Sequence, residues 1–107
     1  MSYATVLDAL GDPTRRAIVE QLREGPTPVG KIAERLPVSR PAVSRHLRVL
    51  SEAGLVRVQP VGSRRLYALD PAGLEAIRDY FDDMWARALA ELKSTAEGGV
   101  PPGRQRR

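Results

Sequence analysis

Basic and hydroxyl side chains recur along one side of the stretch between residues 39 and 50, while its other side is apolar. At about 100° per residue, Val43, Leu47 and Leu50 fall within one narrow sector. Arginine can donate two parallel hydrogen bonds to a phosphate or to the edge of a guanine. The polar side therefore predicts a surface that binds nucleic acid. Its candidate contact residues are Ser39, Arg40, Ser44, Arg45, His46 and Arg48.

His46 lies at the border between the apolar sector and the polar side. Its ring can pack against the core or donate to a phosphate, and both interpretations stay open. Ser39 and Arg40 sit at the start of the expected helix, where they can hold a phosphate as well as a base. His46 has no serine, carboxylate or metal partner in the pattern, which makes it a poor candidate for catalysis.

A second basic group, Arg64 and Arg65, follows a turn signal at residues 60–63. Residues 55–59 and 64–69 show the period-two pattern that predicts the two strands of a hairpin. The hairpin can be an ordinary ribbon that closes the core. Two arginines beside a Gly-Ser turn favour instead a basic loop that reaches phosphates or a narrow minor groove.

Local capping signals place the helix that must carry the first basic group. Ser39 can accept a hydrogen bond from a free backbone amide, and Pro41 fits the first turn, where its missing N–H costs nothing. Gly54 is suited to the left-handed residue that stops a helix. The helix is therefore expected over about residues 40 to 53.

Shorter helices are expected before it. Residues 3–10 are apolar at helical spacing, and the pair Asp12-Pro13 predicts the start of a second helix. The pair Thr27-Pro28 repeats that signal and predicts a third, short helix that Pro37 ends. Only a two-residue connection then leads to the cap of the next helix, which is the spacing of a helix-turn-helix.

A long helix is expected from Asp70-Pro71 to about Ala96, a length of about 38 Å. Its apolar stripe is longer than a small core needs. The helix either folds back on its own core or pairs with a second copy of the chain, and the length favours pairing through the terminal helices. The candidate dimer contacts are Val6, Leu7, Leu10, Phe81, Met84, Trp85, Ala88, Leu89 and Leu92.

Charge is unevenly distributed along the 107 residues, whose net charge is +4. Residues 31–69 carry eight Lys or Arg against two Asp or Glu, whereas residues 70–97 carry three against seven. A basic middle beside an acidic segment is typical of a protein that binds nucleic acid, and a merely solvated charged surface is the alternative.

Chain length, hydrophobic patterning and cysteine content predict the domain organisation and the cellular location. One domain is expected over residues 1–97, followed by a disordered basic tail over residues 98–107. No apolar run approaches the roughly 20 residues of a membrane span, and residues 1–4 begin no signal peptide, so we expect a cytoplasmic protein without membrane contact. The absence of cysteine excludes disulfides and thiolate metal sites.

The order of these elements and three strings of residues resemble the ArsR/SmtB family of winged helix-turn-helix repressors. The strings are residues 9–16, residues 38–50 and residues 64–71, and the similarity covers about residues 3–92. The resemblance implies a mainly α fold with a small β-hairpin, in which a winged helix-turn-helix dimerises through its terminal helices. It also implies a homodimeric repressor that binds a partly palindromic operator in double-stranded DNA and is often released by an effector.

The metal ligands of many members of that family have no counterpart in this sequence. Those members bind metals through cysteines on the helix before the recognition helix, or through histidines and carboxylates on the C-terminal helix. Here residues 32–36 offer no thiolate, and the expected long helix has no histidine. Asp79, Asp82 and Asp83 alone make a poor transition-metal site. The chain thus resembles a metal-independent branch, with no metal or cofactor expected and no effector assigned.

Three classes of function can be compared. A sequence-specific transcriptional regulator accounts for both basic groups. A winged-helix module that binds protein, or coats DNA without sequence preference, is the alternative, and steep salt dependence with equal affinity for any duplex would identify it. The sequence offers no phosphate loop, nucleophile-base pair or metal cluster, so an enzyme is not expected.

Overall fold

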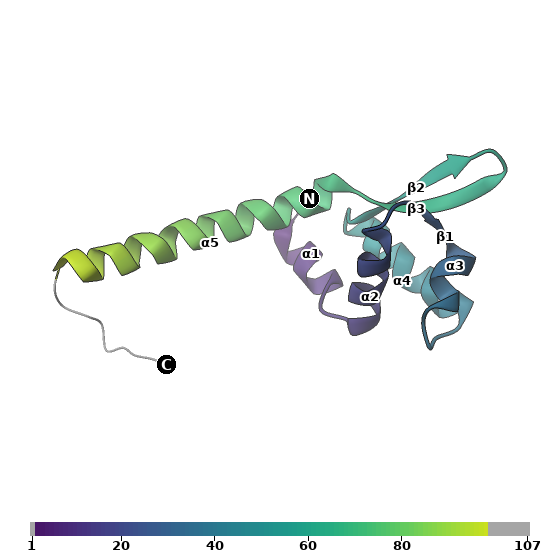
Figure 1. Cartoon of the computed structure of the whole chain (residues 1–107), viewed down its shortest axis with the longest axis horizontal. Helices are drawn as coiled ribbons and strands as arrows, with labels where there is room; N and C mark the ends of the chain where they lie inside the picture. Colours follow the sequence, from purple (N-terminus) through teal and green to yellow (C-terminus); the bar gives the residue numbers. More distant parts are fainter. Residues whose placement is uncertain (1, 99–107) are drawn as a thin grey trace. The chain divides into compact units, whose positions relative to one another are not determined.

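Five helices and three strands form the part of the chain that the computed structural model describes, residues 2–98 (Figure 1). The elements are, in order, α1 (Tyr3–Ala9), α2 (Pro13–Leu22), β1 (Thr27–Pro28), α3 (Val29–Glu34), α4 (Arg40–Glu52), β2 (Val56–Val61), β3 (Arg64–Leu69) and α5 (Pro71–Gly98). The chain divides into two compact units after Ile77, within α5. The expectation of a mainly helical fold with a small sheet is confirmed. The tail expected over residues 98–107 lies, apart from Gly98, outside the described residues.

The helix starts follow the capping chemistry of the sequence. Asp12 Oδ2 accepts the Arg15 backbone N–H at 2.9 Å and caps α2. Ser39 Oγ accepts the Ala42 N–H at 3.2 Å and caps α4. Asp70 Oδ1 accepts the Ala72 backbone N–H at 3.0 Å at the start of α5. A side-chain oxygen that accepts a hydrogen bond from a free backbone amide stabilises a helix by about 1 kcal/mol. Because each cap and its amide are only two or three residues apart, the local sequence predicts these helix starts.

The expected cap at Thr27-Pro28 is wrong, because these two residues form strand β1. Thr27 pairs with Tyr67 and Pro28 with Leu66 on β3. The Thr27 hydroxyl donates to the carbonyl of Gly25 at 2.9 Å and makes no cap, and α3 begins without any side-chain cap. Pairing with a distant strand decides the structure of this segment.

The turn between α3 and α4 is longer than expected. α3 ends at Glu34, three residues before Pro37, so residues 35–39 connect the two helices in place of a two-residue link. A proline disfavours helical geometry in the residue before it, which moves the helix end upstream of Pro37.

β3 is the central strand of a three-stranded antiparallel sheet in the order β1-β3-β2. β2 and β3 are joined by Gly62 and Ser63, and Gly62 has the positive φ of 61° that a tight hairpin turn favours. β2 therefore extends to Val61, beyond the expected residue 59, while β3 has the expected bounds. Pro60 is tolerated within β2 because β2 is an edge strand.

The core lies between α1, α2, α3, α4 and the base of the sheet. Val43, Leu47 and Leu50 are buried, as the apolar sector of the helix predicted. The other buried apolar residues are Val6, Ala9, Ile18, Leu22, Ile32, Ala53, Leu55, Val56 and Ala68. Tyr67 and Leu69 pack against this cluster and close it from the sheet side.

Val6 is wrongly placed among the expected dimer contacts. Its side chain is fully buried in the core of its own chain, so no partner surface can reach it. Leu10 is half-buried against the same core, and Leu7 is half-exposed. A short amphipathic helix cannot show by sequence alone whether its apolar side covers its own core or a partner.

The start of α5 is fixed to the end of α4 through backbone groups. The Gly73 N–H donates to the Gly54 carbonyl at 2.9 Å, and the Asp70 N–H donates to the Leu55 carbonyl at 2.8 Å. Ala76 and Ile77 pack against the core. No helix among the described residues is both long enough and apolar enough to cross a membrane.

Candidate nucleic-acid interface

The candidate contact residues of α4 lie on its exposed side. Ser39, Arg40, Ser44, Arg45 and Arg48 are exposed, and so are Arg64 and Arg65 at the start of β3. None of these five guanidinium groups is paired with a carboxylate among the side chains of residues 2–96. The buried side of α4 holds the helix in the core and leaves these cations free for an anionic partner.

A cleft of about 520 Å³ brings part of α4 and the hairpin together. Arg40 and Ser44 line it from α4, and Arg64 and Arg65 line it from β3. Its remaining lining residues are Pro28, Val29, Gly30, Ser63 and Tyr67. The lining residues, all of them within the described chain, include three guanidinium groups and no carboxylate, which suits the cleft to a phosphate-bearing strand.

Arg45 and Arg48 lie outside the lining of this cleft, although they are equally exposed. They are three residues apart on α4 and therefore neighbours on one side of the helix. The predicted contact residues thus fall into two sets, one facing the hairpin and one further along α4. Sequence reasoning did not separate them, and it missed residues 28–30, whose position depends on the pairing of β1 with β3.

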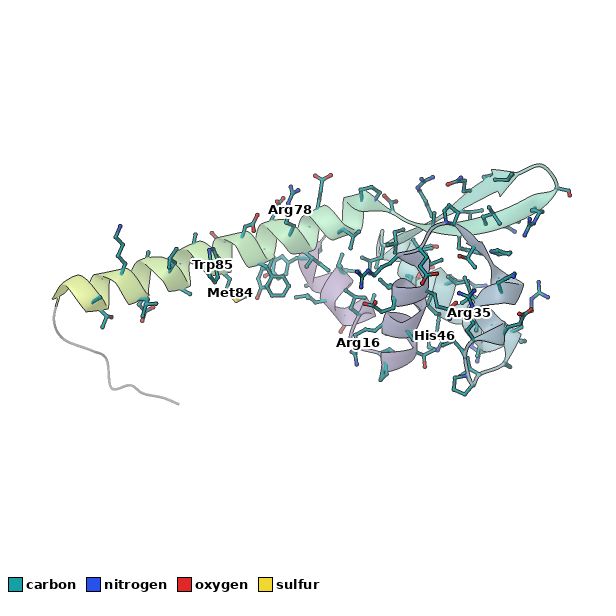
Figure 2. The ribbon with its side chains drawn as sticks, viewed as in Figure 1. Arg16, Arg35, His46, Arg78, Met84 and Trp85 are labelled. Atoms are coloured by element: carbon teal, nitrogen blue, oxygen red, sulfur yellow. The ribbon has the colours of Figure 1, made fainter. Side chains whose placement is uncertain are left out.

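His46, which is labelled in Figure 2, is half-buried. Its Nδ1 faces residues of α2 and the cap of α2. Nη1 of Arg15 lies 3.5 Å from Nδ1, and Oδ2 of Asp12 lies 3.9 Å from it. The backbone N–H of Arg15, which donates to the Asp12 carboxylate, holds the pKa of Asp12 below its ordinary value, and the charges of His46 and Arg15 act in the same direction. Sequence analysis read Asp12 only as a cap and did not find this cluster.

The second compact unit presents an apolar side of α5 to solvent. Trp85 is 69% exposed and Leu92 67% exposed, and Phe81, Met84 and Leu89 are each more than two-fifths exposed (Figure 2). Phe81, Met84, Trp85 and Ala88, with Asp82, border a shallow hollow of about 380 Å³. Exposed apolar side chains gathered in this way are typical of an interaction surface.

Comparison with known proteins identifies the family. The family profile described as "Helix-turn-helix domain" matches residues 10–59. Over 81 residues the chain is 60% identical to the HTH-type transcriptional regulator Rv2034 of Mycobacterium tuberculosis, covering 76% of each chain. The structure of an ArsR-like transcriptional regulator from Rhodococcus sp. RHA1 superposes with a TM-score of 0.70 at 35% identity, covering 88% of this chain and 92% of that one. The chain belongs to the ArsR family.

Membership in the ArsR family makes the protein a DNA-binding transcriptional regulator with a winged helix-turn-helix, as the sequence predicted. A possible transcriptional regulator for arsenical resistance has a related structure, with a TM-score of 0.67 at 43% identity over 80% of this chain and 94% of that one. The helix-turn-helix match contains α4 with all its candidate residues. Arg64 and Arg65 lie beyond that match, on the wing, which we define as residues 56–69.

The acidic residues of this ArsR-family chain form no multidentate cluster in the described part. No group of three or more His, Cys, Asp or Glu among the side chains of residues 2–96 is arranged to hold a metal ion. Asp83 pairs with Arg87 at 3.0 Å, and Asp79 lies 3.4 Å from Arg78. Two of the three aspartates considered as weak metal ligands are thus neighbours of cations.

Proposed function

We propose that this ArsR-family protein is a homodimeric repressor that binds a partly palindromic operator, with α4 in the major groove and the wing on the adjacent backbone. The observation that carries the proposal is the set of five unpaired guanidinium groups on α4 and the wing, three of which share one cleft. An α-helix fits the major groove, where each base pair presents a distinct pattern of donors and acceptors.

The two sets of basic residues support two roles at the DNA. Arg40, Arg64 and Arg65 converge on the cleft, where they can hold successive phosphates of one strand. Arg45 and Arg48 stand beside the cleft on α4, where bidentate contacts with guanine are possible. We assign the phosphates to the first set and base reading to the second, with Ser39 and Ser44 as backbone contacts.

A second copy of the chain is the partner we propose for the apolar side of α5. Phe81, Met84, Trp85, Ala88, Leu89 and Leu92 would form the contact, with Leu7 and Leu10 of α1 as further candidates. Burial of exposed apolar surface contributes about 25 cal/mol per Å². A two-fold dimer also presents two copies of α4 to the two halves of a palindrome.

The proposal includes an effector mechanism without a transition metal and a cytoplasmic location. The chain has no cysteine and one histidine, and that histidine faces Asp12 and Arg15. These residues lack the soft thiolate or multiple imidazole ligands that favour such metals. A regulator must also reach chromosomal DNA, which is why we expect the protein in the cytoplasm.

The experiment compares Arg45→Ala and Arg48→Ala with Arg23→Ala, which removes the same charge from the C-cap of α2, where Arg23 pairs with Glu20. Affinity is measured for a duplex selected from a randomised pool and for a scrambled duplex. Each α4 variant should lose about 1 to 3 kcal/mol on the selected duplex and relax its sequence preference, with Arg23→Ala close to wild type. Wild-type affinity in both α4 variants would refute the assignment of base reading to them.

A further inference from the structure

A polar cluster joins three helices at the inner edge of α4. The Arg15 Nε–H donates to the Ala9 carbonyl at 2.6 Å, at the end of α1. The same guanidinium places Nη1 3.5 Å from Nδ1 of His46 on α4. Asp12, the cap of α2, lies 3.9 Å from that nitrogen. One side chain of α2 thus contacts both α1 and the helix that carries the DNA-facing arginines.

The hydrogen-bonding capacity of these groups fixes the direction of the contact. A guanidinium is a donor only, so Arg15 can bond a neutral His46 only where Nδ1 accepts. The Asp12 carboxylate accepts the Arg15 backbone N–H at 2.9 Å and lies 3.9 Å from Nδ1 of His46. The side chains of His46 and Asp12 are 24% and 32% exposed, so water only partly screens this contact. The contact therefore acts as a specific link between α2 and α4.

Small rotations of α4 matter for DNA reading. His46 directly follows Arg45 and precedes Arg48 by two residues in the sequence of the helix. A rotation of about 10° moves a group that lies about 6 Å from the helix axis by about 1 Å. Bidentate contacts need their donors placed within about 0.5 Å. The buried side chains hold α4 in the core. A polar contact at the border of the buried side can fix the small rotation about the helix axis that this packing still allows.

We infer that Arg15 and His46 are positioning residues, which set the rotation of α4 through Nδ1 of His46 and so determine how sharply Arg45 and Arg48 discriminate between DNA sequences. The inference rests on the proposed function of α4. It assigns His46 to the contact between α2 and α4 and removes it from the residues that contact DNA.

Two substitutions of His46 separate this role from a phosphate contact. The short amide of Asn can place its oxygen near the position of Nδ1, and the longer amide of Gln reaches toward the position of Nε2. His46→Asn should retain most of the preference for a selected duplex over a scrambled one. His46→Gln should lower that ratio about tenfold, the scale of one lost base contact. A phosphate contact through Nε2 would give the reverse order and would lower the salt slope of the Asn variant by about 1.

Two adjacent arginines supply a matched control. Arg16 Nη1 donates to the Leu10 carbonyl at 2.8 Å, and Arg15 donates to the Ala9 carbonyl at 2.6 Å and to the Asp8 carbonyl at 3.5 Å, so each variant loses its contact with the end of α1 and one positive charge. Only Arg15 also reaches α4. Arg15→Ala should therefore lower the selected-to-scrambled ratio about tenfold, while Arg16→Ala keeps it.

The ratio is measured well below the unfolding temperature, with the folded fraction checked by circular dichroism, so that a purely structural contribution to stability does not change it. If Arg15→Ala fails to fold, the pair of His46 variants decides. A discriminating wild type with unchanged ratios in His46→Gln and Arg15→Ala overturns this inference alone. A wild type that binds every duplex equally overturns the proposed function, and this inference with it.

Discussion

Gly73 is a position where one added methyl group would collide with the backbone. A Cβ at this position would lie 2.5 Å from the Gly54 carbonyl oxygen and 2.7 Å from the Gly54 carbonyl carbon. Both atoms belong to the backbone, so no flexible side chain can move aside. The Gly73 N–H also donates to that carbonyl at 2.9 Å, and this bond would be stretched as well.

The expected cost of Gly73→Ala follows from two opposing effects. Overpacking against a rigid neighbour destabilises a protein by about 1 to 3 kcal/mol. The higher helix propensity of alanine stabilises the helix by about 0.5 to 1 kcal/mol relative to glycine. The variant should therefore be less stable than wild type by about 1 kcal/mol, the difference between the midpoints of these two ranges.

Urea unfolding followed by circular dichroism measures this change. The urea concentration at the unfolding midpoint should fall, while the dependence of the unfolding free energy on urea concentration stays the same. Gly30→Ala is the matched control, because a Cβ on Gly30 in α3 meets nothing within 4 Å. That variant should be neutral or slightly more stable. A Gly73→Ala protein as stable as wild type would refute the close packing of α5 on the end of α4.

Three further outcomes are expected. The double variant Arg64→Ala, Arg65→Ala should lower the salt slope of DNA binding by about 2, one unit for each phosphate contact, and leave the sequence preference nearly unchanged; a full loss of preference would contradict the assignment. Trp85→Glu should shift the sedimentation mass from dimer toward monomer, while Ala90→Glu, on the opposite side of α5, should not. Asp12→Asn keeps a capping oxygen but no charge. Because the pKa of Asp12 is lowered, its charge contributes stability above its ordinary pKa of 3.8 that is lost as pH falls through the folded-state pKa. Wild type should therefore lose more stability than Asp12→Asn on acidification below about pH 4, and parallel pH curves would refute this.

Local chemistry made the helix starts predictable. The caps at Asp12, Ser39 and Asp70 use atoms two or three residues away, so the signal is complete within a short stretch. The same reasoning failed at Thr27-Pro28, where pairing with β3, some forty residues later, overrides a cap-like sequence. Long-range pairing is invisible to a local pattern.

The candidate site was predictable as a list of residues but not as a geometry. The exposed side of α4 follows from helical periodicity, so its basic residues could be named in advance. The cleft combines α3, α4 and β3, and the contact of His46 with Arg15 spans 31 residues. Val6 shows the opposite failure, because an apolar residue on a short helix can serve its own core or a partner equally well.

The preference of the wild-type protein for one DNA sequence tests the central claim most directly. Purified protein is titrated against the intergenic DNA upstream of its own gene and against a scrambled duplex at about 150 mM salt, with chelator and added metals in parallel. We predict a preference of about a thousandfold or more that chelator does not change. Equal affinity for both duplexes, together with no enrichment of any sequence from a randomised pool, would contradict sequence-specific repression through α4.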